Sequence, residues 1–151
     1  MAIAISLHLL ATVVWVGGMF FAYMALRPVA ASLLEPPLRL PLWSQTFARF
    51  FPWVWVAVFT LLGTGLWMVF SAFGGFGNVG LHIHLMTGIG TLMILLYAYV
   101  FFVPYRGMKQ ALAVKNIPEA GKQLAQIRLI IALNLSLGLI VTVIASAGRY
   151  S

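Results

Sequence analysis

The chain has 151 residues, of which 63% are hydrophobic and 7% charged, and it carries a formal net charge of +7. A water-soluble domain has about 25% charged residues, so this composition excludes an ordinary soluble domain. The length allows one domain of about four membrane-crossing helices, since each needs ~20 apolar residues. The sequence has no cysteine, which excludes disulfides, thiolate metal sites and a cysteine nucleophile.

Four apolar runs predict membrane spans over residues 2–26, 52–73, 81–103 and 125–147. No Lys or Arg precedes the first run, so we expect it to be retained rather than removed as a signal peptide. This run is expected to end at Arg27-Pro28, because proline does not continue a helix. The prolines that follow argue against a long helix before Trp43. Residues 1–151 are therefore predicted to form a single all-α membrane domain, a four-helix transmembrane bundle.

The connections between the spans differ in charge. Residues 74–80 read GGFGNVG, which predicts a short hairpin turn. The other two connections hold all but one of the basic residues: Arg27, Arg39, Arg49, Arg106, Lys109, Lys115, Lys122 and Arg128. The positive-inside rule places both of them in the cytoplasm and both termini outside. Orientation and lipid contact explain these charges, so we predict a lipid bilayer as partner and no nucleic acid.

Two further patterns concern helix starts and repeats. Pro118-Glu119 has the form of a helix start with an acidic first turn.

An offset of 76 residues aligns His8 with His84 and Pro28 with Pro104. This offset suggests two parallel helix hairpins related by a pseudo-twofold axis along the membrane normal. Four spans also leave a large lipid-facing perimeter, which is compatible with a homodimer.

All three histidines, His8, His82 and His84, fall in the outer third of spans one and three. An ionisable side chain inside a membrane is a functional hypothesis by default. Helical geometry separates the two histidines of span three. The His84 face is mostly small or weakly polar: Thr87, Gly88, Thr91, Leu95 and Ala98. We expect it to face the bundle, since small residues mark where helices or flat ligands approach closely. His82, Met86, Ile89 and Met93 fall on the other side.

On span one, the His8 face mixes small and aromatic residues: Ala11, Thr12, Trp15, Met19 and Ala22. With both faces inward, His8 and His84 would oppose each other at one depth. Two opposed imidazoles are what a b-type haem needs as axial ligands. In this hypothesis Thr12 and Gly88 make room for the porphyrin, Trp15 and Trp67 pack on it, and Arg149 pairs with a propionate. The predicted activity is electron transfer with quinone or another redox partner; an enzyme of this kind would be a membrane oxidoreductase.

Other readings of the same residues stay open. His82-Ile83-His84-Leu85-Met86 combines imidazole and thioether, which suits Cu(I). On a continuous helix His82 and His84 point about 160° apart, so both could bind one copper ion only if the helix unwinds after Gly80. The histidines could also be structural. Paired-carboxylate catalysis is excluded, because the chain has no aspartate and Glu35 and Glu119 lie on the cytoplasmic side.

Polar Asn134 shares one stripe of span four with Gly138, Val141 and Ala145. An amide inside the membrane needs a hydrogen-bond partner, and a neighbouring helix is the usual source of one. We therefore predict that Asn134 faces the bundle and makes an interhelical hydrogen bond.

The stretches LHLLATVVWVGGMFFAYMALRPVA, IHLMTGIGTLMILL and AGRYS resemble the CopD family of bacterial inner-membrane proteins. The strongest part is the pattern of His8, Trp15-Val16-Gly17-Gly18 and Arg27-Pro28. The resemblance implies a bacterial inner-membrane protein with a role in copper resistance or copper import. CopD-like domains are also distantly similar to HemJ, the membrane protoporphyrinogen oxidase, which implies a b-type haem held by His8 and His84.

Overall fold

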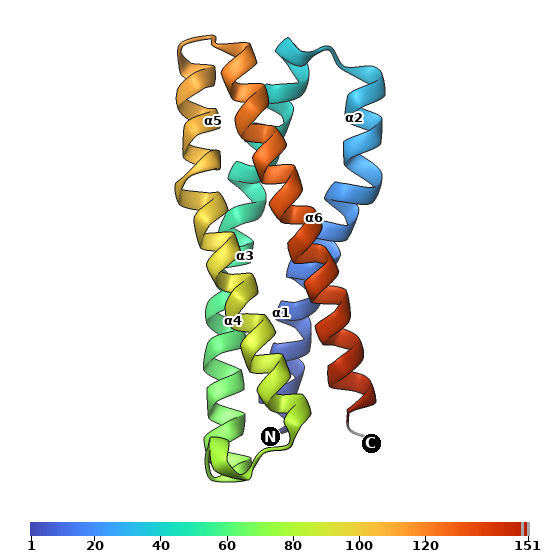
Figure 1. The fold of residues 1–151 in the computed structure, drawn as a ribbon, viewed down its shortest axis with the longest axis vertical. Helices are drawn as coiled ribbons and strands as arrows, with labels where there is room; N and C mark the ends of the chain where they lie inside the picture. The colour runs from blue at the N-terminus through green and yellow to red at the C-terminus, as the bar shows by residue number, and fades with distance from the viewer. Residues whose placement is uncertain (149, 151) are drawn as a thin grey trace.

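The computed structural model describes residues 1–148 and 150, and this part of the chain is almost entirely helical (Figure 1). Its elements are α1 (Ala2–Phe21), the π-helix η1 (Ala22–Leu26), α2 (Arg27–Leu33), α3 (Pro36–Phe73), the 3₁₀-helix η2 (Phe76–Asn78), α4 (Leu81–Phe102), α5 (Pro104–Ala113) and α6 (Ile117–Ala147). Four runs, residues 2–33, 36–73, 81–113 and 117–147, are long and apolar enough to cross a membrane. The predicted all-α four-helix transmembrane bundle is confirmed.

The connections gather at two opposite ends of the bundle. The start of α1, the end of α6 and the glycine turn lie at one end, and the α2–α3 and α5–α6 connections lie at the other (Figure 1). We call the first the histidine end, because His8, His82 and His84 lie near the helix ends there, and the second the basic end. The chain therefore crosses as two hairpins, with both basic connections on the same side; the assignment of that side to the cytoplasm stays a prediction.

The first span does not end at Arg27-Pro28, as the sequence suggested, but continues as helix to Leu33. A π-helical turn precedes the proline, and within it the Arg27 N–H bonds to the Ala22 carbonyl, five residues back. Proline lacks an N–H and clashes with the carbonyl four residues before it. The wider turn absorbs both defects, so the helix passes Pro28 without ending.

The helix that carries the second span begins at Pro36, so the expectation of no long helix before Trp43 is wrong. Pro36 and Pro37 occupy the first turn, where the backbone N–H groups have no helical partner and proline loses nothing. The 38 residues of α3 correspond to about 57 Å at 1.5 Å per residue. A bilayer's hydrocarbon core is only ~30 Å thick, so α3 extends well beyond it, toward the basic end.

The remaining connections follow the sequence more closely. Gly74 and Gly75 adopt positive φ angles of 71° and 122° in the turn between α3 and α4, a conformation that glycine adopts without steric cost. The predicted helix start at Pro118-Glu119 is confirmed, since the Asn116 side chain accepts a hydrogen bond of 3.2 Å from the Glu119 N–H.

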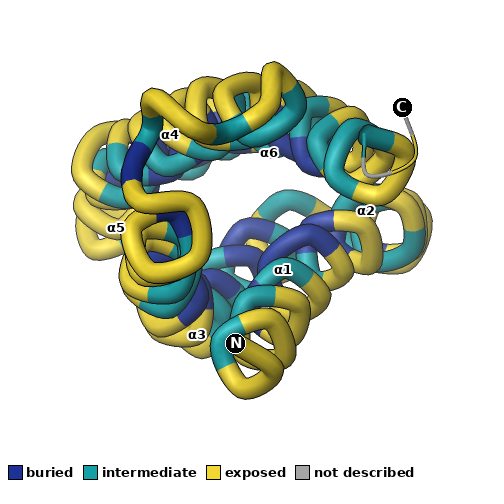
Figure 2. The backbone as a smooth tube through the Cα atoms, turned by 90° about the horizontal axis from the view of Figure 1, so that it is seen from below, coloured by how far each residue is buried: buried dark blue, intermediate teal, exposed yellow. Residues whose placement is uncertain are grey.

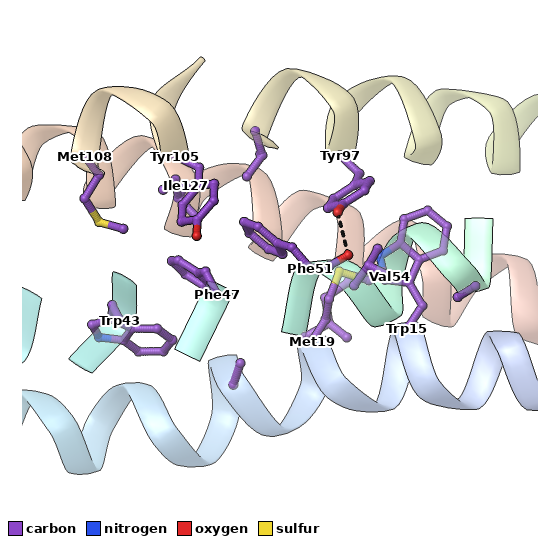
Figure 3. Packing of buried hydrophobic residues seen from close by; sticks show 14 of the residues in the cluster. Trp15, Met19, Trp43, Phe47, Phe51, Val54, Tyr97, Tyr105, Met108 and Ile127 are labelled. Carbon is purple, nitrogen blue, oxygen red and sulfur yellow. Dashed lines mark hydrogen bonds between the residues drawn. The ribbon is translucent and has the colours of Figure 1, made fainter. Parts of the chain in front are cut away.

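Aromatic residues fill the middle of the bundle, where α1 pairs with α3 and α4 pairs with α6 (Figure 2). The Tyr97 hydroxyl of α4 donates a hydrogen bond of 3.0 Å to the Phe51 carbonyl of α3 (Figure 3). Trp15 of α1 packs edge-on against the Tyr97 ring, with 6.1 Å between centroids. All three side chains are buried. Tyr97 thus ties the two hairpins together.

The fourth helix joins this core through a polar contact and a glycine. Asn134 is buried, and its Nδ2 donates a hydrogen bond of 3.1 Å to the Met93 carbonyl, which confirms the predicted interhelical bond. A Cβ atom added at Gly138 would lie 2.9 Å from Val16 and 3.2 Å from Met93. The missing side chain therefore lets α6 approach α1 and α4 closely.

This close approach makes Gly138 sensitive to substitution. We expect Gly138→Val to lower the free energy of unfolding by about 1–3 kcal/mol, because Val16 cannot move aside without disturbing the core. Gly17→Val is the matched control, since a Cβ at Gly17 meets no atom within 4 Å. Thermal unfolding in detergent measures both variants. Equal loss of stability in the two would contradict this packing.

Candidate functional site

The inward face predicted for span one is confirmed. Ala11, Trp15, Met19 and Ala22 are buried, and Thr12 and His8 are half-buried on the same stripe. His8 lies one to two turns beyond the aromatic core toward the histidine end. Its ring sits against α3, where a Cβ on Gly65 would lie 3.6 Å from His8 Cε1. This is an ordinary van der Waals distance, so the imidazole packs directly on the backbone of α3 at Gly65.

The hydrogen bonds around His8 fix its protonation. His8 Nδ1 lies 2.8 Å from Thr64 Oγ1. The Thr64 hydroxyl donates its own hydrogen to the Thr60 carbonyl, 2.6 Å away. A carbonyl cannot donate, so Thr64 Oγ1 has only a lone pair to offer and must accept from His8 Nδ1–H. In the neutral ring Nε2 then carries a free lone pair. This is the arrangement of a metal-binding histidine, whose second nitrogen donates to an orienting partner.

The inward face predicted for span three is wrong. Thr87, Gly88 and Thr91 are exposed, and Leu95 is 62% exposed. The buried residues of α4 are instead Met93, Tyr97 and Val100. Thr87 and Thr91 bond back to carbonyls of their own helix at 2.8 and 2.7 Å, so their hydroxyls need no interhelical partner and can face lipid.

Because α4 turns its other face toward the bundle, His82 faces inward and His84 faces outward, which is the reverse of the prediction. His82 lies four residues before Met86 and eleven before Met93, on the stripe that faces the bundle. It is half-buried, and a Cβ on Gly148 would lie 2.6 Å from its Cβ, so the end of α6 packs directly on it. His84 is exposed, and its ring lies 6.3 Å from that of Phe76 in the turn. The predicted inward position of His84 is therefore occupied by His82.

The same geometry decides how the HxHxM string is arranged. α4 is a regular helix from Leu81 onward, so the unwinding that would let His82 and His84 converge does not occur. His82 and Met86 are four residues apart and share the inward face, where Met86 is half-buried. Among the described residues, no three of the types His, Cys, Asp and Glu come together as a metal-binding group.

The remaining residues assigned to the haem hypothesis differ from one another in their exposure and in their contacts. The Thr12 hydroxyl bonds to the His8 carbonyl at 2.9 Å. Trp15 is 3% exposed in the aromatic core, and Trp67 is 48% exposed on α3. Gly88 is on the exposed face of α4, and Arg149 lies outside the described residues.

The interior of the bundle is less tightly filled at the histidine end than at the centre. At the centre the inward stripes are buried on all four spans: Trp15, Met19, Val54, Val58, Met93, Tyr97, Asn134 and Gly138. Toward the histidine end Val69 of α3 stays buried, and the other residues of the inner faces are half-buried: His8, Thr64, Met68, His82, Met86, Val141 and Ala145. His8 and His82 therefore both keep part of their surface accessible.

Thr64 and Gly65 were not identified from the sequence. Their only signal is the small-residue string Gly63-Thr64-Gly65 in an otherwise bulky span. Such a string allows close packing of a neighbouring helix, but it does not identify the side chain that packs there. The structure shows that this side chain is the imidazole of His8.

The protonation of His8 can be tested directly. In ¹⁵N NMR spectra of histidine-labelled protein without metal, we expect His8 to carry its proton on Nδ1. Thr64→Val removes the acceptor and should give a mixture of tautomers. Thr60→Val is the matched control, because the Thr60 hydroxyl bonds only within its own helix, to Val56. A wild-type ring protonated on Nε2 would contradict the inferred hydrogen-bond direction.

Comparison with known proteins gives one match. A family model described as copper resistance protein D, CopD, matches residues 44–147, a segment that runs from Ser44 in α3 to the end of α6 and includes His82 and His84. No curated protein and no solved structure matches the chain. Since the matched segment covers more than half of the sequence and all of it lies in the transmembrane bundle, the chain belongs to the copper resistance protein D (CopD) family.

Proposed function

We propose that the chain binds one haem b at its histidine end, with His8 and His82 as axial ligands, and that it carries electrons there. What supports this most is that His8 and His82 are both half-buried at the same end of the bundle, His8 bonded to Thr64 of α3 and His82 packed on the end of α6. His82 takes the place that the sequence assigned to His84, because His84 faces away from the bundle interior.

The donor set suits a haem. Its iron needs only two ligands from the protein, since the porphyrin supplies four nitrogens. Two inward histidines meet this need, whereas a site built from His, Cys, Asp or Glu alone would lack donors in the described part of the chain. The half-buried inner surface near Gly65 and Ala145 favours a flat, bulky ligand, since small side chains let one approach the backbone.

The chain's own residues would have three tasks. Thr64 would orient the His8 ring through its hydrogen bond to Nδ1 and leave Nε2 as the nitrogen that binds iron. The buried aromatic core around Tyr97 would form the inner boundary of the site. The apolar helices keep the surroundings low in dielectric, which tunes a reduction potential. A bound haem would supply the one-electron chemistry.

The position near the helix ends makes exchange with a partner feasible. With the basic end in the cytoplasm, the site lies near the periplasmic face of the inner membrane. A quinone in the bilayer or a periplasmic redox protein could then reach it. Whether the chain is an oxidoreductase or a carrier depends on that partner.

Copper binding is the second candidate, and two observations favour it. The family is described by copper resistance, and His82 and Met86 lie one turn apart on the inward face of α4. Imidazole with thioether suits Cu(I). In this alternative His8, His82 and Met86 would bind the ion at the same end of the bundle, for binding or import.

Absorption spectra separate the histidines. We expect purified protein to show a Soret band and, when reduced, a sharp alpha band. His8→Ala and His82→Ala should each lose at least about 90% of this signal, because a haem iron with one axial ligand missing is held weakly. His84→Ala is the matched control and should keep it. Equal losses in His82→Ala and His84→Ala would contradict the assignment, and colourless protein with stoichiometric, Met86-dependent copper would replace haem by the second candidate.

The Thr64 contact should also set the reduction potential. A hydrogen bond from Nδ1–H makes an imidazole a stronger electron donor, which favours ferric iron. Thr64→Val should therefore raise the midpoint potential measured by spectroscopic titration, while Thr60→Val leaves it unchanged. An unchanged potential in Thr64→Val would show that this contact does not act on the ligand.

A further inference from the structure

A second feature lies at the opposite end of the bundle from the histidines. A cavity of about 420 Å³ opens at the basic end between η1, α2, α3 and α6. Three arginines, Arg27, Arg39 and Arg128, line it. They come from three different helical segments, so the fold gathers positive charge that the sequence spreads over a hundred residues.

The arginines meet no opposite charge in this cavity. The chain has only two acidic residues, Glu35 and Glu119, and neither belongs to the described lining. Arg27 is held in place, with its Nε donating to the Tyr23 carbonyl at 3.2 Å and its guanidinium 4.3 Å from the Tyr23 ring centroid. A guanidinium fixed in this way keeps further N–H donors for an anion, and phosphate matches their geometry.

The first turns of α3 and α6 border the cavity. Pro36 and Ile117, the first residues of these helices, both belong to the lining. Helix N-termini carry a partial positive charge of about half a unit, but Glu35, which precedes α3, and Glu119, in the first turn of α6, offset it. The three arginines are therefore what favours an anionic ligand.

Below the arginines the cavity is apolar. Leu40, Trp43, Phe47 and Ile131 line this part, together with Ala22 of the π turn. The apolar stretches of α1 and α6 reach the basic end at Arg27 and Arg128, so these two groups mark the level of the lipid headgroups. The cavity thus has a cationic upper part at the membrane surface and a hydrophobic part that reaches into the hydrocarbon.

We propose that this cavity binds an anionic phospholipid, with its phosphate on Arg27, Arg39 and Arg128 and the start of its acyl chains on the apolar residues below. Basic pockets between helices at the cytoplasmic side of membrane proteins bind such headgroups. A free phosphate from the cytoplasm would use the same arginines but would leave the apolar part unused, and this difference separates the two sources.

Native mass spectrometry of the purified full chain, incubated with phosphatidylglycerol or phosphatidylcholine, tests the proposal. We expect preferential retention of phosphatidylglycerol. Arg39→Gln and Arg128→Gln should each weaken it about tenfold, since each removes a charge-assisted hydrogen bond to the phosphate. The matched controls are Arg49→Gln and Arg106→Gln, two exposed arginines of the same end that do not line the cavity. Equal weakening in controls and cavity variants would overturn the proposal in favour of general surface attraction.

A second variant tests the apolar part without changing charge. Ala22→Phe fills the cavity below the arginines and should weaken phosphatidylglycerol retention by a similar factor, while thermal unfolding verifies that the variant is folded. Inorganic phosphate is offered alone in a parallel titration. Tight phosphate binding that is unaffected by Ala22→Phe, with no preference for phosphatidylglycerol, would show a soluble anion as the ligand and would overturn the lipid assignment.

Discussion

Every backbone N–H and carbonyl inside the hydrocarbon layer must find its hydrogen-bond partner within the protein, and this requirement shapes the whole bundle. It explains why Pro28 does not end a helix here: the π turn before it accommodates the missing N–H, and α2 continues. The extended helices then form the walls of the arginine-lined cavity. The same requirement lets Thr87 and Thr91 face lipid, because each hydroxyl is bonded within α4.

The packing of the helices differs between the middle of the bundle and its two ends. In the middle, Trp15, Phe51 and Tyr97 interlock and join the hairpins. At one end of this core lie the half-buried His8 and His82, and at the other end lies the cavity lined by arginines. The buried centre of the CopD chain thus separates a proposed metal centre from a proposed lipid site.

The number of spans, their approximate positions and the shared side of the basic connections could be predicted from hydropathy and charge. The side of each helix that faces the bundle interior could be predicted only for some of the helices. In water, polarity separates the inner and outer faces of a helix, but lipid is as apolar as a protein core, so this signal is lost. The prediction relied on small residues instead. It succeeded on α1, where Trp15 and Met19 share the His8 face, and failed on α4, where the bulky Met93 and Tyr97 face inward. Thr64, the partner of His8, comes from a different helix and could not be inferred from the spacing around His8.

The electron paramagnetic resonance spectrum of the oxidised, haem-loaded protein tests the central claim most directly, since it reports the axial ligands of the iron. Two imidazoles produce a low-spin ferric signal, and ¹⁵N labelling of histidine should change the hyperfine coupling of two axial nitrogens. The account predicts this signal in the wild type and in His84→Ala, and its loss in His8→Ala and in His82→Ala. A high-spin wild-type spectrum, or a low-spin signal that survives in His82→Ala, would contradict it.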